Sequence, residues 1–325
     1  MEVIPGRGPG VEPLRSSDVS PVTPRVRVRA DRFDITGALG PGASALVPLS
    51  QDERAAWARV PADPPPERLH RDTHYFVSNE CEIDRVAPLI RNVGNTLVAV
   101  GGLNAYLLAG WARSTLIVHI DQDHALAAMH RVCNVAFRCE EPEGFVRWWD
   151  PSTGSSAAEV ARRLSNGDVE VFEQCRKEVF EFLQESRDGY RSFVNDPVQY
   201  QHLCTLAAQG RNIALCGDIT RTGAWTQMGE HLQRFGHRVG VYYESNVADF
   251  LDPRIGVQRD NVAALPVGIG AVALTTGASG REDWRYELAP LKLHHDYIHS
   301  VGIYAPDSKT KPTVKRLNGV DIISA

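Results

Sequence analysis

The chain has 325 residues, of which 43% are hydrophobic and 23% charged, and it carries a net charge of -5. A chain of this length buries a substantial core and suits one large domain with accessory segments. The acidic balance gives no electrostatic footprint for nucleic acid, and no apolar run reaches the roughly 18 residues of a membrane span.

The cysteines and the first residues indicate a cytoplasmic protein. The six cysteines are scattered without a C-x-x-C pair, which argues against a disulfide framework or a zinc knuckle. The N-terminus lacks the apolar region of a signal peptide. We therefore expect reduced thiols, no bound metal and a cytoplasmic location.

The first 66 residues lack the pattern of a folded domain. Residues 1–24 are rich in Pro, Gly and Ser, and residues 25–29 alternate apolar and basic side chains, as in an edge strand whose arginines face water or an anionic partner. Residues 60–66 include four prolines and predict a stiff linker. We expect a flexible arm and linker over 1–66 and the main domain over 67–325.

The main domain begins with a helix predicted at about 81–92. Two apolar runs, 97–100 and 115–120, predict strands that are joined by a glycine turn at 101–102 and a short helix. A helix over 124–137 follows. This order of strand, turn, helix and strand is that of a nucleotide-binding crossover.

Residues 140–210 predict helices and no strand. Their apolar spacing favours helices at 157–164, 169–185 and 197–209, which together form a helical insertion or lid. The alternation of strands and helices then resumes with a strand at 212–216, a helix at 224–235 and a strand at 238–243. Further strands are expected at 261–265 and 300–304. The fold class is therefore α/β, a Rossmann-like, doubly wound and mostly parallel sheet.

Polar residues and glycines follow the predicted strands where ligands of parallel sheets bind. They are Gly101, Gly102 and Asn104, then Asp121 and Asp123, then Gly217, Asp218 and Thr220, and finally Tyr243, Ser245 and Asn246. The chain has no GxGxxG motif, Walker lysine or basic cluster for a pyrophosphate. This combination favours an adenosine ligand without phosphate, such as S-adenosylmethionine.

Structural roles are open for several of these residues. Asp121 is placed either to hold ribose hydroxyls or to cap the next helix. The turn at 217–218 is either part of a site or a simple connection, and Asn246 either contacts a ligand or forms an Asx turn. His119, inside the second strand, is expected to be a paired core histidine.

Five segments carry a family resemblance: FVSNE at 76–80, VGGLNAYL at 100–107, HID at 119–121, GDI at 217–219 and YYESNV at 242–247. In this order they resemble an uncharacterised bacterial branch of class I S-adenosylmethionine-dependent methyltransferase-like proteins, with azetidine-2-carboxylate synthases as further relatives. The resemblance covers about residues 70–265 and implies the class I methyltransferase fold. The cofactor-binding residues then expected are Asn79, Gly101, Gly102, Asn104, Asp121, Asp218, Ser245 and Asn246.

The resemblance implies an enzyme that uses S-adenosylmethionine as cofactor. The first hypothesis is methyl transfer to a small molecule of bacterial secondary metabolism. The residues expected to position or deprotonate the acceptor are Tyr75, Glu80, Tyr106 and Tyr243.

Other uses of the same cofactor stay open. One is its cyclisation to azetidine-2-carboxylate with release of methylthioadenosine, which needs no second substrate. Another is aminocarboxypropyl transfer to an acceptor, and a third is a non-catalytic adenosine-ligand sensor. The expected partner is a small molecule or the cofactor alone, with neither nucleic acid nor membrane. The oligomeric state stays open.

Three competing sites have weaker patterns. His294, His295, Asp296 and His299 have a metal-ligand spacing but also suit a surface helix. Cys204 or Cys216 is either a nucleophile or a buried packing residue. Trp148, Trp149 and Tyr190 line either a substrate pocket or a core.

Overall fold

An eight-stranded sheet organises the chain. The computed structural model describes residues 46–153, 169–185, 193–247, 256–278, 284–297 and 313–324. All of them fall within one compact unit, 36–325. Among these residues, none of the helices combines the length and apolar character needed to cross a bilayer.

The strand order is β3-β2-β1-β4-β5-β6-β8-β7. The strands are β1 Thr96–Ala99, β2 Leu116–Asp121, β3 Asn212–Cys216, β4 Val239–Ser245, β5 Val267–Ala278, β6 Trp284–Pro290, β7 Thr313–Leu317 and β8 Val320–Ser324. The first five are parallel to one another, whereas β6 is antiparallel to β5 and β7 to β8. The fold is thus α/β with a mostly parallel sheet, as predicted, and it is compatible with a Rossmann-like fold.

Helices precede or connect most strands. The α-helices are α1 Gln51–Trp57, α2 Ala87–Ile90, α3 Asn104–Ala112, α4 His124–Ala136, α5 Pro142–Trp149, α7 Val169–Glu185, α8 Pro197–Ala208, α9 Gly223–Arg234, α10 Gly256–Ala263 and α11 Leu291–Tyr297. Short 3-10 turns lie at η2 His70–Asp72, η3 Ile83–Val86 and η5 Phe193–Asn195. Asp123 and Asp196 cap α4 and α8 through their side chains, as the sequence of each start favours.

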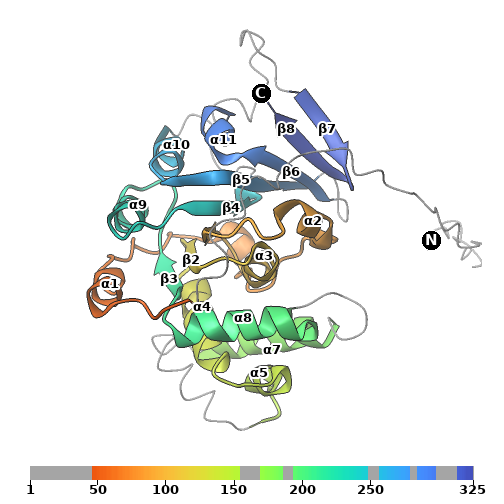
Figure 1. Cartoon of the computed structure of the whole chain (residues 1–325). Coiled ribbons are helices and arrows are strands. Elements are labelled where there is room, and N and C mark those ends of the chain that lie inside the picture. Colours follow the sequence, from red (N-terminus) through yellow and green to blue (C-terminus); the bar gives the residue numbers. More distant parts are fainter. Residues whose placement is uncertain are drawn as a thin grey trace, which may run out of the picture. The chain divides into compact units, whose positions relative to one another are not determined.

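Two apolar cores cover the two faces of the sheet. Leu97 and Ala99 of β1 pack with helices α2–α5, α7 and α8, whereas Val98 packs with α1, α9, α10 and α11 on the other face. Figure 1 shows α9, α10 and α11 on one side of β4 and β5 and α2 and α3 on the other. Both faces are buried, which explains why the central strands are continuous apolar runs.

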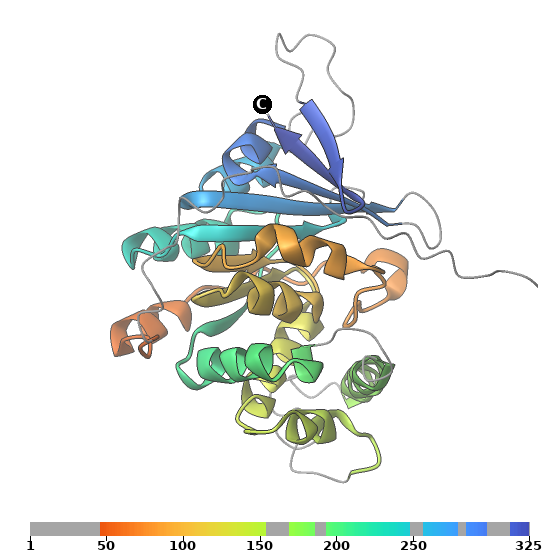
Figure 2. The same ribbon diagram turned by 45° about the vertical axis from the view of Figure 1, so that its right-hand side comes forward.

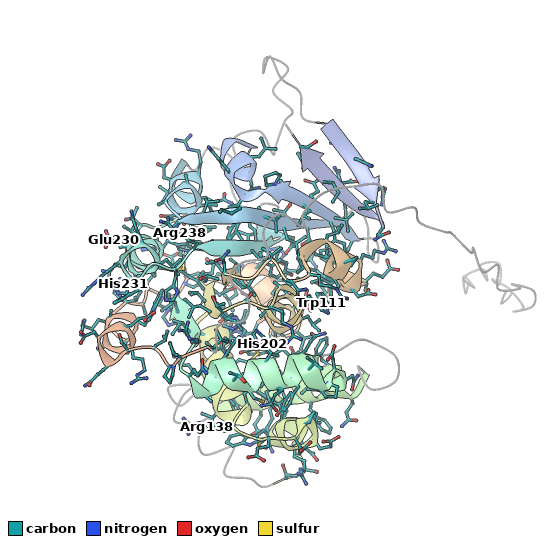
Figure 3. All side chains as sticks on the ribbon, in the orientation of Figure 1. Trp111, Arg138, His202, Glu230, His231 and Arg238 are labelled. Atoms are coloured by element: carbon teal, nitrogen blue, oxygen red, sulfur yellow. The ribbon has the colours of Figure 1, made fainter. Side chains whose placement is uncertain are left out.

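The helical insertion is confirmed where the structure describes it. Helices α5, α7 and α8 lie together beside β2 and β3, and β7 and β8 lie at the far end of the sheet (Figure 2). His202 on α8 donates to the Ser114 carbonyl at 2.9 Å and so ties this block to the end of α3 (Figure 3). The helix expected at 157–164 and the strand expected at 300–304 lie outside the described residues.

Two predicted elements differ from the structure. The strand at 261–265 is wrong: Asn261 lies in α10, and the strand begins at Val267. The reason is that β5 is rich in Gly and Ala, which have low strand propensity. The helix at about 81–92 is shorter, a 3-10 turn followed by α2, because Glu82 has a left-handed φ of 60°.

The expected boundary at residue 66 also differs. Buried Leu49 and Trp57 belong to the core on the α9 face, and α1 contacts α9. The proline-rich segment is not a spacer, because the Asp63 amide donates to the Cys216 carbonyl at 3.0 Å. Residues 46–66 are therefore part of the domain, whereas residues 1–45 lie outside the described part of the chain.

A buried polar network lies between β2, α3 and α4. The Tyr106 hydroxyl donates to His130 Nδ1 at 3.0 Å, and His130 Nε2 donates to the Gly101 carbonyl at 3.0 Å. His119 stacks on His130 with ring centroids 3.6 Å apart and donates to Asn212 Oδ1 at 2.8 Å. Burial lowers the pKa of His130 to about 4 and that of His119 well below its ordinary value. Both rings are thus neutral, and His119 is the paired core histidine that the sequence predicts.

Tyr106→Phe removes the hydroxyl that His130 and Asn212 share. We expect the free energy of unfolding to fall by about 1–3 kcal/mol, because two buried polar groups lose their partner. Urea unfolding measures the loss. Tyr75→Phe is the matched control, since the Tyr75 side chain is exposed, and equal stability of the two variants would contradict this role of Tyr106.

Candidate functional site

A cavity of about 650 Å³ opens at the carboxyl ends of β1, β2, β3 and β4. Its wall includes Gly101 after β1, Asp121 at the end of β2, Asp218 after β3 and Ser245 at the end of β4. The chain runs outward from β1 to β3 and returns on the other side of β1 as β4. Ligands of open α/β sheets bind at such a switch point.

The glycine turn after β1 requires both of its glycines. Gly101 has φ +93°, a conformation that L side chains rarely adopt. A Cβ on Gly102 would lie 2.1 Å from the Phe76 carbonyl oxygen, so only glycine at this position allows the backbone of Phe76 to approach so closely. The two glycines thus permit a close backbone contact and also form the floor of the cavity.

Asp121 is fixed by two backbone amides. Its Oδ2 accepts from Gly101 N at 3.0 Å and its Oδ1 from Asp123 N at 2.8 Å. Burial raises the pKa of its carboxyl from 3.8 to about 6, although the amide hydrogen bonds act in the opposite direction. Each carboxylate oxygen has a further lone pair for a ligand donor. The capping role belongs to Asp123, so Asp121 is not the helix cap.

The start of α3 has few amides left for a phosphate. The amides of Leu103, Ala105 and Tyr106 donate to the carbonyls of Phe76, Gly102 and Leu103, respectively. The Gly101 amide is held by Asp121. A dinucleotide site instead directs such amides at the pyrophosphate.

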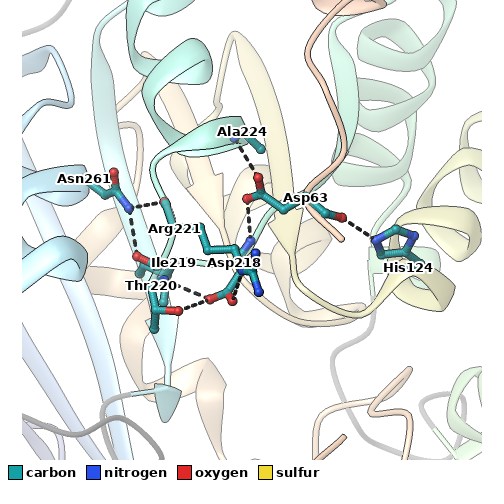
Figure 4. A network of polar contacts seen from close by, with 8 residues as sticks. All are labelled: Asp63, His124, Asp218, Ile219, Thr220, Arg221, Ala224 and Asn261. Atoms are coloured by element: carbon teal, nitrogen blue, oxygen red, sulfur yellow. Dashed lines mark hydrogen bonds and ion pairs between the residues drawn. The ribbon is translucent and has the colours of Figure 1, made fainter. Parts of the chain in front are cut away.

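The turn after β3 is held by residues distant in sequence (Figure 4). Asp63 accepts from Asp218 N at 3.0 Å and from Ala224 N at 3.4 Å, so it caps α9 from outside the helix. Asn261 donates to the carbonyls of Ile219 and Arg221 at 2.8 and 2.7 Å. This turn is therefore a rigid part of the cavity wall.

Glu80 is a buried carboxylate behind the wall formed by β4. Its Oε2 accepts from the Tyr243 hydroxyl at 2.5 Å and from the Asn104 amide at 3.3 Å. Its Oε1 accepts from Ser245 at 2.8 Å and from Thr276 at 2.6 Å. All four donors are neutral, so they orient the carboxylate without cancelling its charge.

Most of the predicted site residues come together. The cavity is lined by Tyr75, Asn79, Gly101, Gly102, Asp121, Asp218, Tyr243, Ser245 and Asn246. Glu80 and Asn104 lie directly behind this lining, joined to each other. Tyr106 is buried in the core beside His130 and is not part of the lining, so a catalytic role for it is wrong in this geometry. The reason is that it lies one helical turn past the glycines.

The sequence pattern missed parts of the site. Residues 69–73 line one wall, yet they hold no strand end or motif that would have marked them, in contrast to the predicted Tyr75. Trp284 at the start of β6 and Trp225 of α9 also line the cavity. Asp63 belongs to no sequence motif. The sequence signal near it is the group of prolines on either side, which restrict the backbone there.

The competing sites find other roles. His294 is buried and its Nε2 lies 3.1 Å from Glu244 Oε2, whereas His299 lies outside the described residues. No group of three metal-ligating side chains exists within the described residues. Cys204 and Cys216 are buried, and burial raises the pKa of both thiols. Trp149 is buried in the core, Trp148 packs against it, and Tyr190 is not described.

Comparison with known families gives one match. Residues 75–305 match a family described as a domain of unknown function, DUF7790. The match spans more than half of the chain. The chain belongs to this family. A search of curated proteins finds no match.

Asp63→Ala tests the anchor of the turn after β3. We expect the free energy of unfolding to fall by about 1–2 kcal/mol, because α9 loses its cap and the Asp218 amide its acceptor. Thermal unfolding checks this. Glu230→Ala, on the exposed face of the same helix, is the control, and an Asp63 variant as stable as that control would disprove the anchor.

Proposed function

We propose that this protein binds S-adenosylmethionine in the cavity at the ends of β1–β4 and transfers its methyl group to a small molecule. The observation that carries the proposal is Asp121, a half-buried carboxylate at the end of β2 that the Gly101 amide orients and that lines the cavity. A carboxylate in this place pairs with the two hydroxyls of a ribose.

The charges of the cavity suit a cofactor without phosphate. Its wall holds the carboxylates of Asp121, Asp123 and Asp218. The amides at the start of α3 are already used by the protein's own carbonyls. A pyrophosphate would meet these three carboxylates against the one guanidinium of Arg71, whereas an adenosyl group with a cationic sulfur meets opposite charge.

The β4 side of the cavity suits the sulfonium and amino-acid end. Tyr243, Trp284 and Tyr75 supply aromatic surface, and aromatic faces attract cations. Glu80 adds an anion one hydrogen bond behind Tyr243 and Ser245. Ser78, Asn79 and Asn246 offer polar groups for the carboxylate and ammonium of the amino acid.

The strand order supports a class I methyltransferase form of the fold. The order β3-β2-β1-β4-β5 places the cofactor cavity above β1, and an antiparallel strand follows β5. Methyl transfer is favoured over cyclisation because a second cavity adjoins the first and shares Leu69 and Asp123 with it. Cyclisation of the cofactor needs no space for a second substrate.

Incubation of the purified protein with S-adenosylmethionine, followed by mass spectrometry, tests the function. Binding by calorimetry, together with S-adenosylhomocysteine formed only when acceptors are added, supports methyl transfer. Methylthioadenosine formed from the cofactor alone would replace the proposal with cyclisation. Binding without either product would indicate a sensor, and no binding would reject the site.

Asp121→Asn tests the ribose contact. We expect the affinity for S-adenosylmethionine to fall about 10-fold to 100-fold, because a hydrogen bond to a charged acceptor is worth about 1.5–3 kcal/mol. Calorimetry measures this, with thermal unfolding to confirm that the variant folds. Asp260→Asn, at an exposed position of α10, is the control. Equal affinity of wild type and Asp121→Asn would show that the ribose lies elsewhere.

The affinity is also expected to depend on pH. Ribose hydroxyls bind the ionised carboxylate, and burial places the pKa of Asp121 at about 6. Binding therefore requires loss of a proton below that pH, and affinity falls by up to about tenfold per pH unit there. Titrations from pH 7.5 to about 5 measure the slope. The affinity of the Asp121→Asn variant should lack this pH-dependent component. Identical pH profiles of wild type and variant would contradict the prediction.

A further inference from the structure

A second cavity, of about 450 Å³, lies beside the first. Parts of the proline-rich segment, of residues 69–76, of α4 and of α7 form its wall. Most of the residues that line it are apolar, among them Ala62, Pro66, Leu69, Ala128, Val132 and Phe172. A cavity of this size and character suits a small and mainly apolar molecule.

The backbone of residues 73–76 separates this cavity from the first. Thr73 and Tyr75 line the first cavity, whereas His74 and Phe76 line the second. Successive side chains of an extended backbone point to opposite sides, so the two cavities are separate spaces along this stretch. A ligand of the second cavity is therefore recognised by the groups of that cavity.

Arg131 is the permanent cation of the second cavity. It lies on α4, is half-buried and lines the cavity. Its guanidinium contacts the Cys216 sulfur at 3.9 Å, and it forms an ion pair with none of the carboxylates that the structure describes. Sulfur is a weak acceptor, so the guanidinium keeps donors for a stronger one. A half-buried guanidinium beside an apolar lining favours an anionic ligand.

The carboxylate of the same cavity lies at the other end of α4. Asp123 is the N-cap of this helix and Arg131 lies two turns further on, which is about 12 Å along the helix axis. Asp123 Oδ2 lies 2.8 Å from His74 Nδ1, and Asp123 Oδ1 accepts from Ala125 N at 2.9 Å. A helix N-terminus also stabilises negative charge. The charge of Asp123 is thus compensated by its own surroundings, whereas that of Arg131 is not.

The remaining polar groups of the cavity add no negative charge. His124 Nε2 donates to the Asp63 carbonyl at 2.8 Å. Burial raises the pKa of the Cys175 and Cys216 thiols, which keeps them protonated and uncharged. Arg131 is therefore the group that selects the charge of a ligand in this cavity.

We propose that the second cavity is a binding site for a small apolar molecule with one carboxylate, and that Arg131 binds this carboxylate. The apolar body of the ligand packs against Ala128, Val132 and Phe172, which line the same space. The planar guanidinium offers a carboxylate two parallel hydrogen bonds. Binding of this acid needs no methyl donor, so the site is independent of the proposed function.

The charges of the cavity favour a carboxylate over a phosphate ester or a neutral molecule. One guanidinium balances one negative charge, whereas a phosphate monoester carries about −1.5 to −2 at pH 7 and would face Asp123 with the excess. A neutral apolar molecule would remove water from Arg131 and give it no partner, which costs free energy. The rings of Phe76 and Phe172 offer flat surfaces, so aromatic acids are suitable probes.

Binding of 2-naphthoate tests the site without any cofactor. Fluorescence titration of wild type should show saturable binding, tighter than that of 2-naphthamide by at least about tenfold, because the neutral amide lacks the charge that Arg131 pairs with. Arg131→Met keeps an unbranched apolar stem and should bind the two probes within about twofold of each other. Arg138→Met removes an exposed arginine just after α4 (Figure 3) and is the control that should keep the preference.

Arg131→Lys separates charge from geometry. A lysine keeps the positive charge and loses the planar fork, so its preference for naphthoate should fall between those of wild type and Arg131→Met. Thermal unfolding and the binding of 2-naphthamide show whether each variant keeps its fold and its apolar cavity.

Filling the cavity is the second arm of this test. Ala128→Trp, or the milder Ala128→Leu, should weaken 2-naphthoate binding at least about tenfold, because Ala128 lines the cavity. Thermal unfolding identifies a filled variant that is folded. Where neither of them folds, the comparison of wild type with Arg131→Met decides.

The site is rejected if wild type shows no saturable binding of 2-naphthoate, or binds 2-naphthoate and 2-naphthamide equally. An undiminished preference in folded Arg131→Met, or undiminished binding to a folded filled variant, would also overturn it. Titration with S-adenosylmethionine is a separate measurement. Wild type that binds 2-naphthoate and not the cofactor would reject the proposed function alone, and the reverse result would reject this site alone.

Discussion

Both cavities depend on the close approach of the Phe76 carbonyl to Gly102. A Cβ at residue 102 would lie 2.1 Å from that oxygen, and the oxygen accepts from the Leu103 amide at 3.3 Å. This contact holds the extended residues 73–76 across the end of β1. The segment then forms a wall of the first cavity with alternate side chains and a wall of the second with the others. The glycine turn therefore contacts the backbone of residues 73–76 and also forms the floor of the first cavity.

The spacing of two aspartates couples the two cavities. Asp121 accepts from the amide of Asp123, and Asp123 holds His74. The carboxylate proposed for the ribose and the one that contacts His74 thus share a single turn. This shared turn fixes the position of Asp123, which lies in the walls of both cavities, relative to Asp121 in the wall of the first.

The sequence predicted the strand ends well because parallel buried strands are short apolar runs, and the first polar residues after them meet at one edge. Gly101, Asp121, Asp218 and Ser245 follow four such runs, and all four line one cavity. The part of the wall formed by residues 69–74 could not be predicted, because an irregular extended segment has no periodicity, whereas Tyr75 was expected from the adjoining FVSNE segment. The pattern also misplaced β5, whose glycines and alanines have low strand propensity, and it missed the attachment of residues 46–66, which depends on tertiary contacts of Asp63.

The floor beneath the first cavity adds hydrogen bonds and no positive charge to a lining that holds the carboxylates of Asp121, Asp123 and Asp218 and the guanidinium of Arg71. His130 donates to the Gly101 carbonyl, and His119 stacks on His130 at 3.6 Å. Two imidazoles at this distance in a buried site cannot both be charged, and burial lowers the pKa of each. The histidines next to the glycine turn therefore contribute hydrogen bonds without positive charge. With Asp121 in front of them and Glu80 held by neutral donors, the site presents net negative potential, which favours a cationic cofactor over a phosphorylated one.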